Sequence, residues 1–412
     1  DPSYEDILSN GCPTGNFYFV DQNNPNASDE NPGTENLPWK TIEHATHVVQ
    51  AGDIVLIKEG TYQPPASGER LIPALNPANS GTLHSPLIFR AYPGDRIKIS
   101  GDPFLVGANG KDYIIWDGFI LDTSGSSKHG GGVMIAHSKG TIVENCEIIG
   151  HYVEVSNQHD GIYICRNSQD VIVRNCVIHG FKTGGESGNG VKVFNSKNVT
   201  VKNCEIYNCK SAIVDKEEGI NNKYCYNLLH DLEIKAILIM TQDGFDSFGH
   251  EIYNNIFYNN GRAIQFDCDP VMDIKNVSIY NNVLYNSGNI IFKETPSLSL
   301  WNNIIYKDGL IYDCRKLNSK PIYSDYNCFY PGESFILYNN APQEQNFNTL
   351  NEWSQGTGLD NNSIHEDPKF VNPESHNFHL SPTSPCLNTG IDKQDYDNDG
   401  NTTERINMGC YI

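Results

Sequence analysis

Three stretches of the sequence share one pattern: TIVENCEIIG (residues 141–150), VIVRNCVIHG (171–180) and VTVKNCEIYN (199–208). Each places alternating apolar residues on both sides of an Asn-Cys pair. Alternation of this kind is typical of short strands that bury one face. Because the pattern recurs at intervals of 30 and 28 residues, it indicates stacked coils rather than separate domains.

The same pattern continues with Asn in place of Cys in KYCYNLLHD (223–231), HEIYNNIFYN (250–259), VSIYNNVLYN (277–286) and LSLWNNIIYK (298–307). One column therefore runs through Cys146, Cys176, Cys204, Asn227, Asn255, Asn282 and Asn303. In a stack of coils, inward Asn amides can bond to one another, and Cys is small and apolar enough for the same position. We therefore predict a buried column in which the thiols have no catalytic role.

These repeats predict an all-β fold, a right-handed parallel β-helix or solenoid, in a single domain over residues 1–412. Residues 1–62 would form the N-terminal cap and first strands, 63–316 the stacked coils, and 317–412 a loop-rich C-terminal cap. Ile42, Ala45, Val48 and Val49 have helical spacing and end at Gly52, which predicts a capping helix. A helix at that end would cover exposed strand edges.

Composition narrows the classes of partner. The net charge of −21 argues against nucleic acid and anionic membrane surfaces as partners. No stretch approaches the ~18 consecutive apolar residues of a membrane-spanning helix. We expect a monomer that is secreted, periplasmic or on the cell surface of a bacterium, with any signal peptide already removed.

A second strand occurs in each coil: GIYIC (161–165), GVKVF (190–194), AIVDK (212–216), AILIM (236–240) and AIQFD (263–267). The second and fourth positions should face the core and the third and fifth should face outward. Asp215 is the exception, since it places a carboxylate at an inward position.

Long loops at 151–160 and 180–189 should form a wall beside the outward face of these strands, and thus a cleft. Its predicted floor consists of Tyr163, Lys192, Lys216, Gln265 and Asp267. Asp160, Lys235 and Arg262 lie at the entrances to the strands.

Two long segments resemble secreted bacterial polysaccharide-active β-helix proteins. They are the entry segment, from NFYFVDQNNPN to DIVLIKEGTY, and the closing segment, HEDPKFVNPESHNFHLSPTSPCLNTG. SGNGVKVFNS, which contains Lys192, is similar to the strand that carries the catalytic lysine of the family nine pectate lyases. The resemblance implies a calcium-dependent lyase with Lys192 as the base. That family's several clustered Asp ligands are not matched, since only Asp160 and Glu186 are nearby.

The residues themselves fit β-elimination of a uronic-acid-containing polysaccharide. Such a reaction needs a cation on the uronate carboxylate, a base for the α-proton, and an acid or water for the leaving oxygen. We predict Lys192 as the base, Lys216 and Arg262 as uronate-binding catalytic groups, and Asp160 as a residue that helps to hold calcium. The remaining predicted substrate contacts are Tyr163, His159, Lys235, Gln265 and Asp267. The alternative is a solvated strand face with ordinary charges.

The predicted calcium ligands fall in three segments. They are Asp160 and Glu186 in the loops, Glu217 in DKEEGINN (215–222), and Asp395, Asp397 and Asp399 near the end of the chain. The last three, followed by Gly400, match the first half of a calcium-binding loop. Position twelve is Ile406 rather than glutamate, so this segment is either a structural calcium site or a polar turn.

Three other functions stay open on the sequence. A glycoside hydrolase acting on a neutral or sulfated glycan would need paired carboxylates, for which Asp160, Glu186, Asp215 and Asp267 are available. A non-catalytic glycan-binding surface protein would use the same face. A C5-epimerase would share the chemistry of the lyase. His159, in a loop before its strand, would be an acid or base near neutral pH, or a surface residue without a role.

Overall fold

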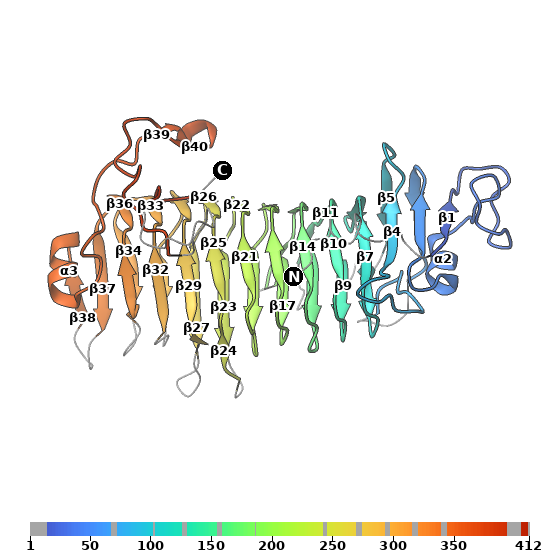
Figure 1. Ribbon diagram of the computed structural model, residues 1–412, viewed down its shortest axis with the longest axis horizontal. Coiled ribbons are helices and arrows are strands. Elements are labelled where there is room, and N and C mark those ends of the chain that lie inside the picture. Colours follow the sequence, from blue (N-terminus) through green and yellow to red (C-terminus); the bar gives the residue numbers. More distant parts are fainter. Residues whose placement is uncertain are drawn as a thin grey trace. The chain divides into compact units, whose positions relative to one another are not determined.

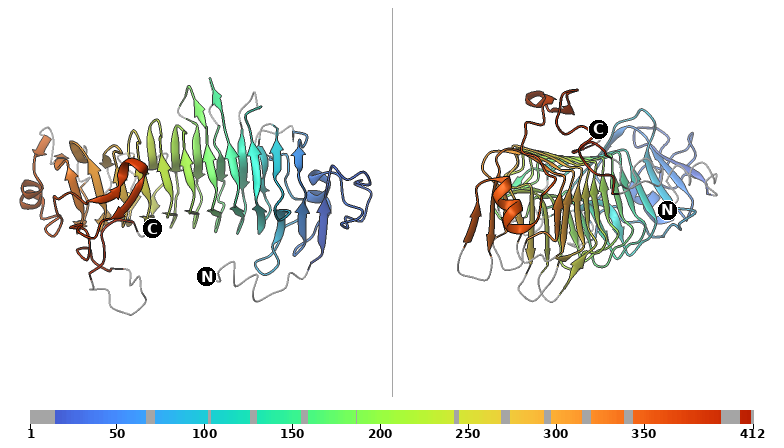
Figure 2. Two further views of the ribbon diagram at one scale, coloured as in Figure 1. Left: turned by 90° about the horizontal axis from the view of Figure 1, so that it is seen from above. Right: turned by 60° about the vertical axis from the view of Figure 1, so that its left-hand side comes forward.

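The computed structural model describes residues 15–66, 72–101, 104–125, 130–154, 159–185, 187–241, 245–268, 274–292, 297–314, 320–338, 344–393 and 405–410. The chain divides into two compact units, unit 1 (Asp1–Lys210) and unit 2 (Ser211–Ile412). Each unit consists of coils whose short strands form three parallel ladders (Figures 1 and 2). The repeat in the sequence therefore becomes a parallel β-helix.

In unit 1 the first ladder contains β1 (Phe17–Val20), β2 (Ile54–Ile57), β4 (Leu87–Ala91), β7 (Ile114–Asp117), β10 (Ile142–Glu144), β14 (Ile172–Arg174) and β18 (Thr200–Lys202). The second contains β3 (Gly60–Tyr62), β5 (Ile97–Ser100), β8 (Phe119–Asp122), β11 (Glu147–Ile149), β15 (Val177–His179) and β19 (Glu205–Tyr207). The third contains β6 (Phe104–Asn109), β9 (Gly131–Ala136), β13 (Ile162–Cys165) and β17 (Asn189–Phe194).

In unit 2 the first ladder contains β21 (Lys223–Cys225), β25 (Glu251–Tyr253), β29 (Val277–Tyr280), β32 (Leu298–Trp301) and β35 (Tyr323–Asp325). The second contains β22 (Leu228–His230), β26 (Ile256–Tyr258), β30 (Val283–Tyr285), β33 (Ile304–Lys307) and β36 (Cys328–Pro331). The third contains β20 (Ser211–Lys216), β23 (Lys235–Thr241), β27 (Ile264–Cys268), β31 (Ile290–Phe292), β34 (Leu310–Cys314) and β37 (Ser334–Tyr338), and β38 (Glu344–Phe347) pairs antiparallel with β37.

The corner between the first and second ladders turns at a single residue with positive φ. In unit 1 this residue is Asn145, Asn175 or Asn203, with φ of 52–54°. Asn tolerates the left-handed region better than most residues, which explains its place at the turn. The next residue then points inward, and it is the member of the Cys and Asn column.

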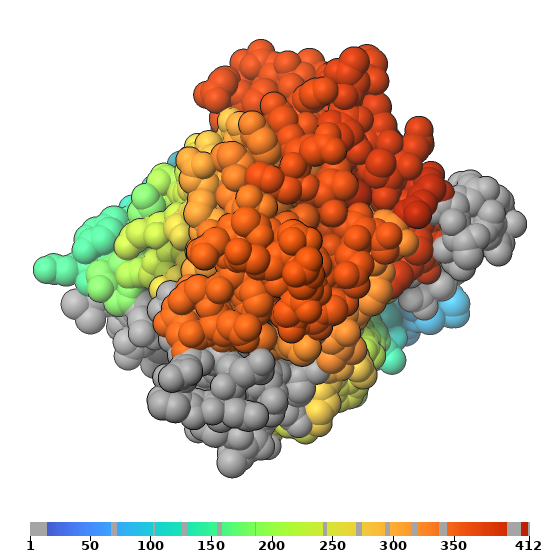
Figure 3. Space-filling model, turned by 90° about the vertical axis from the view of Figure 1, so that its left-hand side faces the viewer, coloured from blue at the N-terminus to red at the C-terminus, as the bar shows by residue number. Residues whose placement is uncertain are grey.

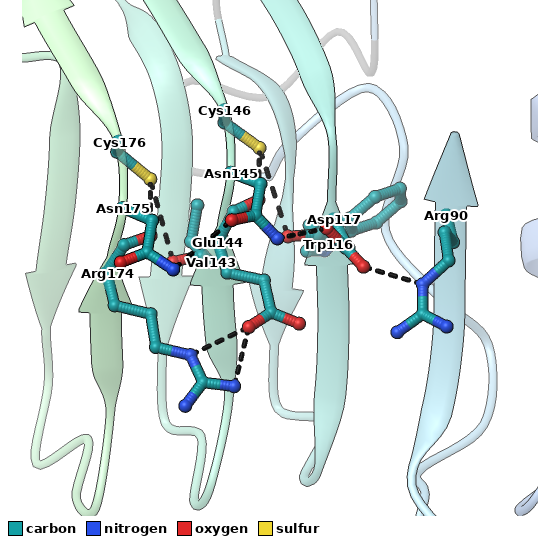
Figure 4. Close-up of polar contacts among 10 residues, drawn as sticks. All are labelled: Arg90, Trp116, Asp117, Val143, Glu144, Asn145, Cys146, Arg174, Asn175 and Cys176. Atoms are coloured by element: carbon teal, nitrogen blue, oxygen red, sulfur yellow. Dashed lines mark hydrogen bonds and ion pairs between the residues drawn. The ribbon is translucent and has the colours of Figure 1, made fainter. Parts of the chain in front are cut away.

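The column is buried as predicted. In unit 1 Cys146, Cys176 and Cys204 are almost fully buried, and each thiol lies near backbone carbonyl oxygens (Figure 4). The Cys176 thiol and burial raise the pKa of Cys146 well above the ordinary value, and burial together with the Cys204 thiol does the same for Cys176. Thiols of this kind are poor nucleophiles because the thiolate is disfavoured.

In unit 2 the column is a continuous ladder of amides. The Nδ2 of Asn227, Asn255, Asn282 and Asn303 each donates to the Oδ1 of the Asn in the following coil, at 3.0 Å. The ladder extends one coil beyond the predicted column to Asn327. Its Nδ2 donates to Oδ1 of the buried Asp360 at 3.1 Å, which ends the chain of amides.

The predicted start of the C-terminal cap at residue 317 is too early. β35, β36 and β37 continue the three ladders in parallel, and they lie beyond that boundary. The apolar alternation is weaker in YSDYNCFYPG, so the sequence pattern did not reveal this last coil. The residues after it include α3 (Leu350–Thr357), β39 (Phe370–Asn372), the 3-10 turn η1 (Pro373–Ser375) and β40 (Asn377–Leu380). In orange, α3 lies at the end of unit 2 that faces the viewer in Figure 3, where Trp353 stacks on Phe335. β40 instead lies against the second ladder, where Phe378 packs on Tyr258 and Tyr285.

The N-terminal helix forms as predicted. α2 (Ile42–Val48) begins after Thr41, whose side chain accepts a hydrogen bond from the backbone N–H of His44. Ile42, Ala45 and Val49 are buried, whereas Val48 is largely exposed and does not contribute to the packed face. Its apolar stripe is therefore narrower than the spacing suggested.

Candidate functional site

The third ladder of unit 1 carries the clearest candidate site. Val191 and Val193 of β17 point into the core and are fully buried, which leaves Lys192 on the outward face. Tyr163 of β13 is its partner in register, and Lys192 Nζ lies 5.3 Å from the centre of the tyrosine ring. The period of two predicted for these strands is therefore confirmed, and it places an aromatic ring and a cation side by side.

Asp160 lies at the entrance to β13 and approaches the same lysine. Its Oδ2 is 3.8 Å from Lys192 Nζ, and the carboxylate is fully buried while 16% of the lysine side chain is exposed. Asn189 holds the other oxygen: its backbone N–H and its Nδ2 donate to Asp160 Oδ1 at 3.2 and 2.7 Å. From the described part of the chain, Asp160 Oδ2 accepts no hydrogen bond, and it faces the ammonium group.

The two long loops do form a wall, and they do so by pairing. β12 (Tyr152–Val153) and β16 (Lys182–Thr183) make a small parallel sheet, with Tyr152 opposite Lys182. Tyr152 is 63% exposed, so an aromatic ring is available to solvent on this wall. The sequence predicted the wall but gave no role to Tyr152.

His159 does not occupy the surface position expected for it. The residue is 1% exposed, and its ring nitrogens face two backbone carbonyl oxygens, Nδ1 that of Gly130 at 3.2 Å and Nε2 that of His151 at 2.9 Å. Burial lowers the pKa of the imidazole. The loop folds over the ring, so the prediction that His159 meets substrate from a surface loop needs correction: it is packed beneath the wall.

Unit 2 carries a second outward cluster on its third ladder. Arg262 donates from Nη1 to Gln265 Oε1 at 2.8 Å, and Gln265 Nε2 donates to Asp267 Oδ2 at 3.2 Å. Arg262 is exposed and Gln265 is buried. Gln265 therefore orients the guanidinium group, which differs from the direct substrate contact predicted for it. Lys216 also points outward, and Lys235 lies at the start of β23, opposite Ser211.

Asp215 points into the core of unit 2, as its inward position required. Its Oδ2 accepts hydrogen bonds from Asn222 Nδ2 at 2.9 Å and Tyr224 OH at 2.6 Å, and His250 Nδ1 lies 3.5 Å away. Burial raises the pKa of Asp215 and lowers that of His250. Glu217, predicted as a calcium ligand, is also buried. A carboxylate in this core position is closed to a polymeric substrate, so Asp215 leaves the set of paired carboxylates proposed for a hydrolase.

Four predicted calcium ligands lie outside the described residues: Glu186, Asp395, Asp397 and Asp399. Among the described residues, no three His, Cys, Asp or Glu side chains come together in a group that would hold a metal ion. Asp160 Oδ2 and Asn189 Oδ1 are buried oxygens that accept no hydrogen bond from the described residues. Oxygens of this kind suit a hard cation such as calcium.

Sequence reasoning missed two residues of unit 1 that support the site. Asn189 is part of the Gly-Asn-Gly stretch before Lys192, and that stretch was a usable signal. Lys210 is a buried lysine whose ammonium group bonds to the wall loop, at Thr183 and Gly185. Nothing in its sequence context distinguishes it from a surface lysine between two strands.

Family models and curated proteins match parts of the chain. A model described as "Right handed beta helix region" matches residues 117–248, and one described as "Protein of unknown function (DUF1565)" matches residues 26–78. The uncharacterized protein YwoF of Bacillus subtilis is 34% identical over 99 residues, which are 24% of this chain and 19% of that protein. Pectate lyase PEL9 of Emericella nidulans is 31% identical over 78 residues, 19% of this chain and 17% of that protein. The chain thus matches about a fifth of the length of each relative.

Among solved structures the chain is similar to pectate lyase Pel9A. The TM-score is 0.60 at 15% sequence identity, and the match covers 98% of both chains. At this identity the likeness concerns the fold. In the described part of the chain, no helix has the length and apolar character needed to cross a membrane. Together with the three parallel ladders and the family model, the likeness confirms the predicted fold: the protein is a right-handed parallel β-helix.

Proposed function

We propose that this protein is a polysaccharide lyase that cleaves an acidic, uronic-acid-containing polysaccharide by β-elimination, with Lys192 as the base. The observation that carries the proposal is the outward Lys192, paired with the buried Asp160 and lying beside the ring of Tyr163. The similarity of one segment to pectate lyase PEL9 supports it.

The reaction fits what these side chains can do. Once the ammonium group beside Asp160 has released a proton to solvent, the neutral amine of Lys192 takes the proton on the carbon next to the uronate carboxylate. The electron pair of that C–H bond becomes the new carbon–carbon double bond. The bond to the glycosidic oxygen breaks, and water protonates the departing oxygen. Tyr163 offers an aromatic face to a sugar ring, while Asp160 fixes the position of the lysine Nζ.

Calcium remains part of the proposal. It would neutralise the uronate carboxylate and so acidify the neighbouring C–H bond. Asp160 and Asn189 are the described residues that would contribute oxygens to it. We expect a chelator to abolish activity and added calcium to restore it. Activity that is indifferent to chelation would remove calcium from the scheme and leave the lysine base in place.

The decisive experiment is a panel of polyuronates, glycosaminoglycans and sulfated algal glycans, assayed for unsaturated products by ultraviolet absorbance and for new reducing ends. A lyase gives both signals, a hydrolase only reducing ends, and a binding protein neither.

Lys192→Ala should lower kcat by about 100-fold or more, the usual contribution of a positioned base. Lys197→Ala, at an exposed lysine of the same unit, serves as the matched control. Full activity of Lys192→Ala would refute the assignment of the base.

Lys216 and Arg262 of unit 2 remain predicted uronate-binding residues. Because Gln265, itself bonded to Asp267, accepts a hydrogen bond from the guanidinium group of Arg262, an anion would meet a preoriented cation there. Arg262→Ala should raise KM for an acidic polymer more than for its methyl-esterified form. Equal effects on both forms would argue against recognition of a carboxylate by this arginine.

A further inference from the structure

We propose that Lys210 is a positioning residue that holds the wall loop (residues 181–188) so that Asp160 meets Lys192. The inference rests on the proposed function, because it concerns the geometry of the proposed base. Among the described residues, no hydrogen bond or ion pair joins Lys210 to Lys192 or to Asp160. Its effect on them would therefore be transmitted through the loop.

The first step is the set of hydrogen bonds that Lys210 donates to the loop. The residue is 8% exposed, and its Nζ donates to the backbone carbonyl oxygens of Thr183, at 3.0 Å, and Gly185. Its backbone N–H approaches the carbonyl oxygens of Phe181 and Gly188, each at 2.9 Å. A lysine ammonium has three donors and no acceptor, so it suits a ring of carbonyl groups. One residue thereby bonds to four carbonyl groups of the loop, those of Phe181, Thr183, Gly185 and Gly188.

The second step runs from the loop to the carboxylate. Ser187 Oγ accepts a hydrogen bond from the backbone N–H of His159 at 3.0 Å, and Asn189 donates twice to Asp160 Oδ1. Ser187 belongs to the wall loop, and Asn189 is the first residue of β17, directly after that loop. The end of the loop and the start of β17 therefore set the direction of the Asp160 carboxylate, whose other oxygen faces Lys192 Nζ.

An alternative is that Lys210 only stabilises the fold. A buried ammonium group costs free energy of desolvation that a leucine or methionine would not. A residue kept only for packing would therefore be replaceable by Met without a specific effect on the site. The two readings differ in what happens at Asn189 and Asp160 when the ammonium group is removed.

The test uses the full chain and four variants: Lys210→Met, Lys210→Arg, Asn189→Ala and the double variant Lys210→Met/Asn189→Ala. Lys197→Met is the control. On the polyuronate identified by the panel, Lys210→Met should lower kcat by about 10- to 100-fold, the effect of a small misplacement of a catalytic group, while KM changes little. Lys210→Arg should recover most of the loss. In a protein that already carries Asn189→Ala, Lys210→Met should lower kcat only slightly further. Both substitutions interrupt the same chain of contacts, which runs from Lys210 through the loop and Asn189 to Asp160.

A second measurement needs no activity. Hydrogen exchange should accelerate at the backbone amides of His159 and Asn189 in Lys210→Met, but not in Lys197→Met. Unchanged exchange, an unchanged kcat, or losses that multiply independently of Asn189 would each overturn the proposal. If the wild-type protein forms no unsaturated product, the proposed function fails, and the exchange measurement still decides the role of Lys210.

Discussion

Units 1 and 2 fill the same corner of their coils with different chemistry. Unit 1 stacks the thiols of Cys146, Cys176 and Cys204, whereas unit 2 stacks amides from Asn227 to Asn327. Each thiol has a backbone carbonyl group of its own coil and one of the coil before it within reach, in addition to the neighbouring thiols. Each amide bonds to the next amide, so the contacts form a chain. The comparison teaches that the side chain at one repeat position can be bonded mainly to backbone carbonyl groups, as in unit 1, or to the same side chain of the next coil, as in unit 2.

The outward faces of the first ladders differ as well. In unit 1 Arg90, Asp117, Glu144 and Arg174 stand in register as two ion pairs, Arg90 with Asp117 and Arg174 with Glu144 (Figure 4). In unit 2 the corresponding row stacks Tyr253, Tyr280 and Trp301, with ring centres 4.9 and 4.6 Å apart. Side chains in register on adjacent parallel strands lie roughly 4.8 Å apart. This spacing suits stacked aromatic rings, whereas a charged side chain needs a neighbour of opposite charge.

Breaking the amide chain should have the largest effect. Asn282 donates to three oxygens, including Asn303 Oδ1, and accepts from Asn255. Asn282→Ala removes the side-chain hydrogen bonds of this residue and interrupts the chain of amides, so we expect a loss of about 3 kcal/mol in the free energy of unfolding. Hydrogen exchange of unit 2 peptides measures the loss locally. A change below about 0.5 kcal/mol would show that the amides act independently of one another.

Placing one amide among the thiols should have a smaller effect. In Cys176→Asn the new amide would lie between Cys146 and Cys204, which offer no carbonyl oxygen from a side chain. We expect a loss of about 2 kcal/mol, more than for Cys176→Ala, because a buried amide without full hydrogen bonding carries a desolvation cost. Chemical denaturation of both variants gives the comparison. Equal stability would mean that backbone carbonyl groups satisfy the amide.

The smallest effect concerns the charges of unit 1. Burial raises the pKa of Glu144 above its ordinary 4.5, and Arg174 only partly opposes this. The protonated carboxyl therefore stabilises the fold fully below the unfolded pKa, and that contribution is lost as pH rises through the folded pKa. Glu144→Gln should gain about 0.5 kcal/mol or less at pH 8 and nothing at pH 4. A destabilised variant at pH 8, in thermal melts, would show that the ion pair with Arg174 dominates.

Much of the fold was predictable because it depends on local periodicity. The alternation in GIYIC and GVKVF predicted which residues face inward, and the burial of Ile162, Ile164, Val191 and Val193 confirms it. The last coil escaped prediction because the apolar alternation is weaker in YSDYNCFYPG (323–332) than in the other repeats.

The candidate site was predictable in its residue types but not in its contacts. Lys192 and Tyr163 follow from the register of two strands, and the register follows from the repeat. The burial of His159 and the role of Lys210 depend on how loops of different length fold over the ladder. Loop conformation is set by contacts between residues 25–28 positions apart, which no periodic signal specifies.

The sequence by itself determined the coil, its inward column and the face that carries Lys192, because apolar period and turn residues act over a few positions. Only the tertiary structure decided that Asp160 and Asn189 converge on Lys192, that Asp215 is enclosed with His250, and that Gln265 orients Arg262. Those outcomes depend on burial and on hydrogen-bond partners from neighbouring coils or loops, and a side chain acquires these only once the coils have stacked.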